Sequence, residues 1–197
     1  PASSNVTLLR MTRLPFALLT FLLLFGLNAP FIRAQGGPRF NVSELESLAK
    51  RGDADAQFEL GLRLITGEDM KKDESTGLVW MEKAANQKHL RAQFVMGSLY
   101  EDGVGVKKDE SKAVDWYRKS ADNGFAPAQF AVAMAFDLGR GIKQDPAKAT
   151  EWLQKAADQN HAQSQTALAA KLERGVGVEK NVSKAALYYL RAAQQDH

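Results

Sequence analysis

Residues 92–124 read AQFVMGSLYEDGVGVKKDESKAVDWYRKSADNG, and the same pattern recurs along most of the 197-residue chain. Large aromatic residues and glutamines mark the recurrence at intervals of 36 positions. They are Trp80, Trp116, Trp152 and Tyr188, and Gln57, Gln93, Gln129 and Gln165. A fixed period of this length indicates a repeat array. We therefore predict a linker and capping helix at 35–52, followed by units at 53–88, 89–124, 125–160 and 161–196.

Each unit is predicted to form two helices. In the quoted unit, Ala92, Met96 and Tyr100 share one face of a helix, which we call helix A. A second helix, helix B, follows Asp109, a residue type that caps helix N-termini. Between them, Gly103 can adopt the left-handed conformation that commonly ends a helix. The pattern therefore predicts one capping helix and four A/B pairs.

The quoted stretch resembles a Sel1-like repeat, a relative of the tetratricopeptide repeat with a longer loop between helix A and helix B. The other three units fit the same pattern, so the resemblance covers residues 53–196. It implies an all-α, right-handed solenoid whose A helices line the concave face. Stacked helix pairs share a continuous core that one pair cannot form alone. We expect the tryptophans to be core residues and the glutamines to tie the turn between units to a helix end.

Residues 16–27 read FALLTFLLLFGL, which is typical of the apolar part of a signal peptide. We interpret residues 1–34 as upstream residues plus a signal peptide, with translation starting at Met11 and cleavage after Ala34. An uncleaved membrane anchor is the alternative, although a span needs about 20 apolar residues. The expected location is therefore periplasmic or secreted, with membrane attachment only if the leader is retained.

Composition excludes several classes of function. The chain is 45% hydrophobic and 25% charged, as folded proteins are, and it has no cysteine for disulfides or thiolate metal sites. Its net charge of +3 comes from three arginines in the first 34 residues, so residues 35–197 are neutral overall. A neutral repeat array offers no positive field to a phosphate backbone, and we predict no nucleic-acid partner.

Few residues suggest catalysis or metal binding. His89 and His161 occupy equivalent places two units apart, too far to share a metal ion, and we interpret them as solvated turn residues. Ser47 and Lys50 form an S-x-x-K sequence, the acylation motif of penicillin-recognising enzymes, but its companion motifs are absent. We therefore predict no catalytic residue, no cofactor and no metal. The alternative is a β-lactam or cell-wall-peptide binding or hydrolysing enzyme, because some cysteine-rich Sel1-like proteins have been linked to β-lactam binding.

Several positions on helix A change chemistry from unit to unit, which indicates freedom from a shared packing constraint. By resemblance these positions face the concave side, so they predict a groove for a protein or peptide partner. The predicted partner-binding residues are Arg91, Val95, Ser98, Asp102, Ala131, Met134, Leu138, Lys171 and Arg174. An apolar centre flanked by charges favours a non-catalytic scaffold or adaptor with a few anchoring contacts.

Overall fold

The computed structural model of the chain describes residues 41–195, so the predicted leader and most of the linker lie outside this range. Within it the chain forms nine α-helices and no strand. They are α3 (Val42–Lys50), α4 (Ala54–Thr66), α5 (Glu74–Asn86), α6 (Leu90–Asp102), α7 (Glu110–Asp122), α8 (Ala126–Leu138), α9 (Pro146–Ala157), α10 (Ala162–Arg174) and α11 (Val182–Ala193). None of these helices is both long and apolar enough to cross a membrane. The predicted capping helix and four A/B pairs are confirmed.

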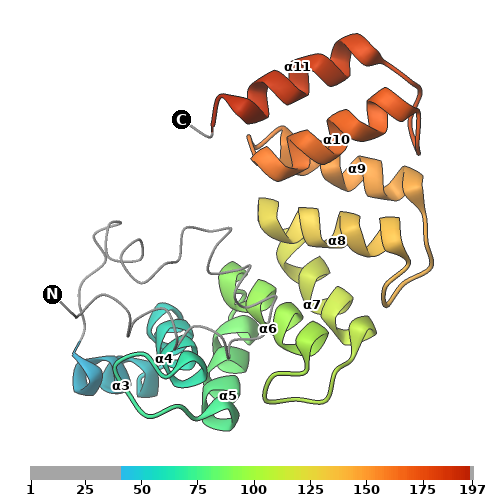
Figure 1. Cartoon of the computed structure of the whole chain (residues 1–197). Helices are drawn as coiled ribbons and strands as arrows, with labels where there is room; N and C mark the ends of the chain where they lie inside the picture. Colours follow the sequence, from blue (N-terminus) through green and yellow to red (C-terminus); the bar gives the residue numbers. More distant parts are fainter. Residues whose placement is uncertain (1–40, 196–197) are drawn as a thin grey trace, which may run out of the picture.

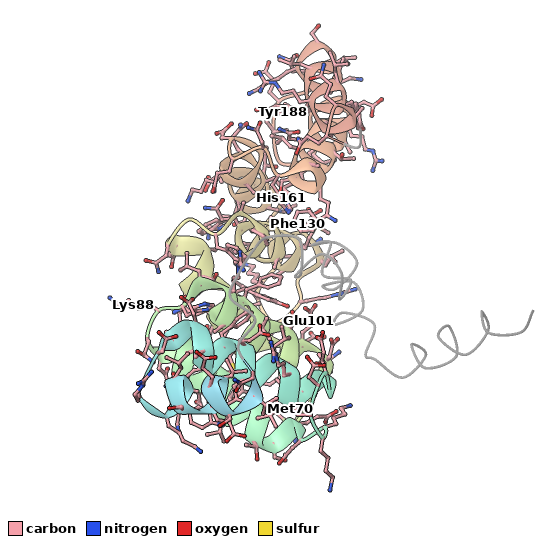
Figure 2. The ribbon with its side chains drawn as sticks, turned by 90° about the vertical axis from the view of Figure 1, so that its left-hand side faces the viewer. Met70, Lys88, Glu101, Phe130, His161 and Tyr188 are labelled. Carbon is pink, nitrogen blue, oxygen red and sulfur yellow. The ribbon has the colours of Figure 1, made fainter. Side chains whose placement is uncertain are left out.

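The helices stack in chain order along a curve, with α3 at one end and α11 at the other (Figure 1). Each A helix (α4, α6, α8, α10) packs against its own B helix (α5, α7, α9, α11), and each B helix except α11 packs against the next A helix. Side chains project from both sides of this stack (Figure 2). The molecule is thus an all-α repeat solenoid.

The helix ends follow the sequence signals. Every B helix begins at an aspartate or asparagine whose side chain accepts the amide three residues on, at 2.8–3.0 Å. These N-caps are Asp73, Asp109, Asp145 and Asn181. Every A helix ends at a glycine with φ between 68° and 78°. At these glycines a side chain would be strained, which explains their recurrence in every unit.

The recurring glutamines join neighbouring units, as predicted. We call Gln57, Gln93, Gln129 and Gln165 the junction glutamines. Each is buried and donates from Nε2 to a carbonyl near the end of the preceding helix, which is α3 for Gln57 and a B helix for the others, at 3.1–3.2 Å. Three of them also accept, through Oε1, the amide of a second glutamine 30 residues later, at 2.7–2.8 Å. A buried amide with both ends satisfied fixes one unit against the next.

The tryptophans are partly buried and combine packing with a second contact that the sequence analysis missed. Lysines that follow them by three residues lie over the rings: Lys119 Nζ is 3.7 Å from the centre of the Trp116 ring, and Lys155 Nζ is 3.9 Å from that of Trp152. The same lysines lie near the C-terminal end of helix B, where a cation is favoured. In α7 and α9 a lysine of the same helix therefore covers the tryptophan ring.

The two histidines are not solvated turn residues, and that prediction was wrong. His89 stacks on Phe58 of the preceding unit at 4.7 Å, and its Nδ1 accepts the amide of Ala92, so it caps α6. His161 lies against Phe130 at 5.5 Å between ring centres (Figure 2). A ring at this position packs beside the phenylalanine 31 residues earlier, and both histidines are partly buried there.

Candidate functional site

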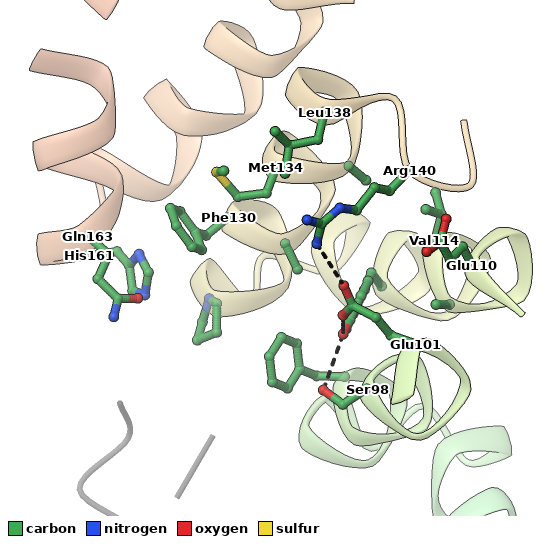
Figure 3. Close-up of a pocket in the computed structure, with 16 residues that line it drawn as sticks. Ser98, Glu101, Glu110, Val114, Phe130, Met134, Leu138, Arg140, His161 and Gln163 are labelled. Carbon is green, nitrogen blue, oxygen red and sulfur yellow. Dashed lines mark hydrogen bonds and ion pairs between the residues drawn. The ribbon is translucent and has the colours of Figure 1, made fainter. Parts of the chain in front are cut away.

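One pocket lies where α6, α7 and α8 meet, with α10 at its edge (Figure 3). Its volume is about 200 Å³, and most of its wall is apolar. The aromatic rings of Phe94, Tyr117 and Phe130 and the thioether of Met134 form much of that wall. We call this site the central pocket. It is the part of the A-helix surface that can enclose a side chain of another molecule.

A small residue in repeat 3, Ala135, accounts for the space in the central pocket. Ala135 lines it, and the equivalent positions in the other units, 36 residues apart, hold Arg63, Leu99 and Lys171. Each of these side chains is much larger than a methyl group. The small residue in repeat 3 therefore leaves space that the other units fill.

The structure brings together four of the nine predicted residues. Ser98, Ala131, Met134 and Leu138 all line the central pocket. Leu138 is 51% exposed, a large fraction for a leucine, and it lies with Met134 along α8 (Figure 3). These two side chains are accessible apolar contacts at the site.

The other five residues do not line the pocket. Val95 is 1% exposed and belongs to the core, so it cannot anchor a partner. Lys171 is 7% exposed and its amine lies 2.5 Å from Asp137. Ser98, although at the pocket, is itself 5% exposed. For Val95, Lys171 and Ser98, the prediction of freedom from packing was wrong, because each A helix is contacted by helices on more than one side. Arg91 and Arg174 are exposed and Asp102 is half-buried, all outside the pocket.

The polar edge of the pocket was missed by the sequence analysis. Tyr117 is buried, and its hydroxyl donates to Glu101 Oε2 at 2.7 Å. Burial and the neighbouring Glu101 charge raise the pKa of Tyr117 well above its usual range, so the hydroxyl keeps its proton. Arg140 points toward the same carboxylate, with Nη1 4.0 Å from Glu101 Oε1 (Figure 3). Repeat 4 has a glutamate and a tyrosine at the same spacing of 16 residues, Glu173 and Tyr189, and their side chains also form a hydrogen bond. The recurrence of this pair in the sequence could have indicated the contact.

The opposite edge comes from repeat 4. His161 and Gln163 line the pocket there. His161 Nδ1 lies 2.8 Å from Ser164 Oγ, and burial lowers the pKa of this imidazole, which favours its neutral form. This side of the pocket therefore carries neutral polar groups, whereas the Glu101 side is charged.

The motif on which the enzyme alternative rested lies on the surface of α3. Ser47 and Lys50 are exposed on α3, and the Lys50 amine lies 3.4 Å from Glu46. No group of three or more possible metal ligands occurs in residues 41–195. Two lysines of the A-to-B loops pair with nearby acids, Lys72 with Glu74 at 2.6 Å and Lys108 with Glu110 at 3.2 Å.

The repeats match a known family model. The model of the Sel1 repeat matches residues 54–89, 90–125, 126–161 and 162–197, one residue later than the units predicted above. The chain belongs to the Sel1 repeat family. A search of curated proteins returns no match.

Two solved Sel1 structures resemble this chain over most of its length. One is a protective antigen present in uropathogenic Escherichia coli strains, with 33% identity and a TM-score of 0.79 over 81% of this chain and 34% of the antigen. The other is a Sel1 repeat protein from Oxalobacter formigenes, with 30% identity and a TM-score of 0.73 over 77% of this chain and 63% of that one. This chain thus spans about a third of the first relative's length. The cysteine rich protein B of Helicobacter pylori, at 17% identity and a TM-score of 0.51, shares the fold.

Proposed function

We propose that this Sel1 repeat chain is a non-catalytic scaffold that binds a protein or peptide partner along the concave face formed by its A helices. The family is a protein-interaction type, and the finer assignment rests on one observation. The central pocket takes most of its lining from the A helices α6 and α8, with α7 as a further wall, and it includes the apolar side chains of Met134 and Leu138. A partner bound there gains affinity from an enclosed apolar anchor, with the remaining contacts spread over neighbouring units.

Partner capture with matched charge variants tests this proposal. The immobilised chain is incubated with extract from the compartment in which it occurs, and bound proteins are quantified. Met134→Glu places a carboxylate in the apolar pocket and should weaken binding by about 2 kcal/mol or more. Lys119→Glu, which reverses a charge on exposed helix B surface, should bind as the parent does. Equal helicity of both variants by circular dichroism shows that folding is unchanged.

The opposite pattern would overturn the proposal. If Met134→Glu binds as well as the parent while Lys119→Glu loses the partner, the B helices form the working surface. In that case the lysines over the tryptophan rings, rather than the central pocket, select the partner.

We also propose that the chain acts outside the cytoplasm, after removal of residues 1–34. The supporting observation is the apolar run at residues 16–27 and its flanks. Mass spectrometry of the protein from its native source should give an N-terminus near Gln35. An intact leader in a membrane fraction would favour the anchored form instead.

A further inference from the structure

We infer that the central pocket selects an extended segment in which an aromatic side chain stands next to a basic one. This inference rests on the proposed function and adds the chemistry of the partner. The aromatic side chain would enter the pocket, and the cation would lie at the edge formed by Glu101.

The volume of the pocket suits one aromatic ring. A dry apolar cavity of roughly 150 Å³ accommodates benzene. The central pocket, at about 200 Å³, therefore has room for a phenyl side chain together with its methylene group. It is too small for a helix or a strand, so a ligand inserts a single side chain, which a short extended segment can present.

The walls favour an aromatic side chain over an aliphatic one of similar size. Phe94 and Tyr117 are tilted by 41° with ring centres 5.3 Å apart, and Phe130 closes another part of the wall. An inserted ring can make the tilted and edge contacts that such rings prefer. Met134 adds a sulfur atom, which also contacts ring edges favourably.

The charged edge favours a cation. Two carboxylates line the pocket, Glu101 and Glu110; Glu110 pairs with Lys108 at 3.2 Å, whereas the guanidinium of Arg140 lies 4.0 Å from Glu101. Glu101 also stands in the last turn of α6, where the helix dipole disfavours negative charge and an added cation relieves it. Beside it is Asp102, whose pKa is raised by burial and by the Glu101 charge. Glu101 is therefore the less closely compensated of the two carboxylates.

The carboxylate of Glu101 is also held in place before a ligand arrives. Its Oε2 accepts the buried hydroxyl of Tyr117, which fixes the side chain at the pocket edge. Arg140 is 60% exposed and 4.0 Å away, so it neutralises Glu101 only loosely. A ligand cation can therefore approach Oε1 without breaking a strong contact.

Three peptides and the methyl resonance of Met134 test the inference. The peptides are capped heptamers of glycine and serine with a central pair that is phenylalanine–arginine, phenylalanine–glutamate or alanine–arginine. Titration into the full chain, labelled at its methionine methyl groups, should shift the Met134 resonance, identified by its absence from Met134→Leu. We expect the phenylalanine–arginine peptide to bind at least ~3-fold more tightly than the phenylalanine–glutamate peptide. The alanine–arginine peptide should bind ~10-fold or more weakly than phenylalanine–arginine.

Matched variants separate charge from shape. Glu101→Gln should reduce binding of the phenylalanine–arginine peptide ~3-fold and remove the preference over phenylalanine–glutamate. Its control is Glu173→Gln, which alters the equivalent carboxylate outside the pocket and should change neither. Arg140→Gln should strengthen binding of the basic peptide, because it removes a competing cation. Ala135→Leu places at this position the side chain that Leu99 holds in repeat 2, and should abolish binding of all three peptides.

Several results would overturn the inference. Tighter binding of phenylalanine–glutamate would show that Arg140 selects an acid, and equal binding of alanine–arginine would show that no ring enters the pocket. No shift of Met134 with any peptide would also reject it. If Met134→Glu still loses the native partner in the capture experiment, the scaffold function stands and only this ligand chemistry fails.

Discussion

The turn between α7 and α8 differs from the turn between α9 and α10, although the repeat places both in the same role. After α9, Gln159 reaches Oε1 of Gln129 at 2.8 Å. After α7 the equivalent residue is Asn123, which is one methylene shorter and donates instead to the Lys119 carbonyl at 2.8 Å. Because the Asn123 amide does not reach it, the buried Oε1 of Gln93 receives no hydrogen bond from the described residues. A single methylene thus decides whether a junction is fully satisfied.

The central pocket lies at this same junction. Repeats 2 and 3 meet at the α7–α8 turn, and α6, α7 and α8 form the pocket walls. The N-cap of α8, Phe125, also makes no side-chain hydrogen bond, whereas His89 caps α6. The unsatisfied Gln93 and the small residue Ala135 are thus two departures from the repeat pattern near the place where we propose that binding occurs. Local inconsistency of this kind is expected at functional sites, because binding and packing place different demands on the same residues.

The largest expected effect compares two junction glutamines. Gln129→Leu removes two hydrogen bonds and leaves the Gln159 amide and the Ala121 carbonyl without their partner, which should cost about 3 kcal/mol. Gln93→Leu removes one hydrogen bond, but it also removes a buried oxygen that has no donor, which offsets part of the loss. The free energy of unfolding should therefore fall by only about 1 kcal/mol. Urea unfolding of both variants measures the difference. Equal losses would show that the two junctions are energetically alike.

An intermediate effect is expected from exchanging the turn residues. Asn123→Gln should let the longer amide reach Gln93 Oε1 and raise the free energy of unfolding by about 1 kcal/mol. The reverse change at the intact junction, Gln159→Asn, should lower it by a similar amount. Thermal melts of the pair provide the measurement. A destabilising Asn123→Gln would mean that the turn cannot accept the longer side chain.

The smallest effect concerns pH at the α5–α6 turn. Burial lowers the pKa of His89, an effect that Asp55 opposes and Arg91 reinforces. The unfolded chain, with an ordinary pKa of about 6.5, then binds the proton more readily, so stability falls as pH drops below that value. His89→Asn keeps an N-cap acceptor but does not titrate, and its free energy of unfolding should vary less between pH 7.5 and 5. An unchanged pH dependence would assign the effect to other groups, including His161, whose pKa burial also lowers.

Much of the fold could be predicted because each repeat signal has a local cause. Asp109 and Gly103 mark helix ends through capping, and the period of 36 requires that what one unit does, the next does too. The role of the junction glutamines followed from their recurrence alone. Such inferences need no knowledge of how the helices face one another.

The site was harder to predict because variation between units has two meanings. At one helix A position the units hold Arg63, Leu99, Ala135 and Lys171, and such variation led us to place Lys171 among the predicted partner-binding residues. In the structure these residues are different solutions to burial: Leu99 is core, and Lys171 is buried with its charge balanced by Asp137. Only Ala135 leaves space. Which residue leaves a pocket depends on side-chain volume against a neighbouring helix, and periodicity does not encode that.

The central claim is that a partner contacts the A-helix surface at the central pocket. Site-specific photo-crosslinking tests it most directly, with a photoreactive phenylalanine analogue at Leu138 or at Val79. These two apolar side chains are almost equally exposed, at 51% and 50%, but Leu138 lines the pocket and Val79 lies on α5. In cells that produce the chain, we predict a discrete covalent adduct from Leu138 that disappears when Ala135→Leu fills the pocket, and none from Val79. An adduct from Val79 with none from Leu138 would contradict the account.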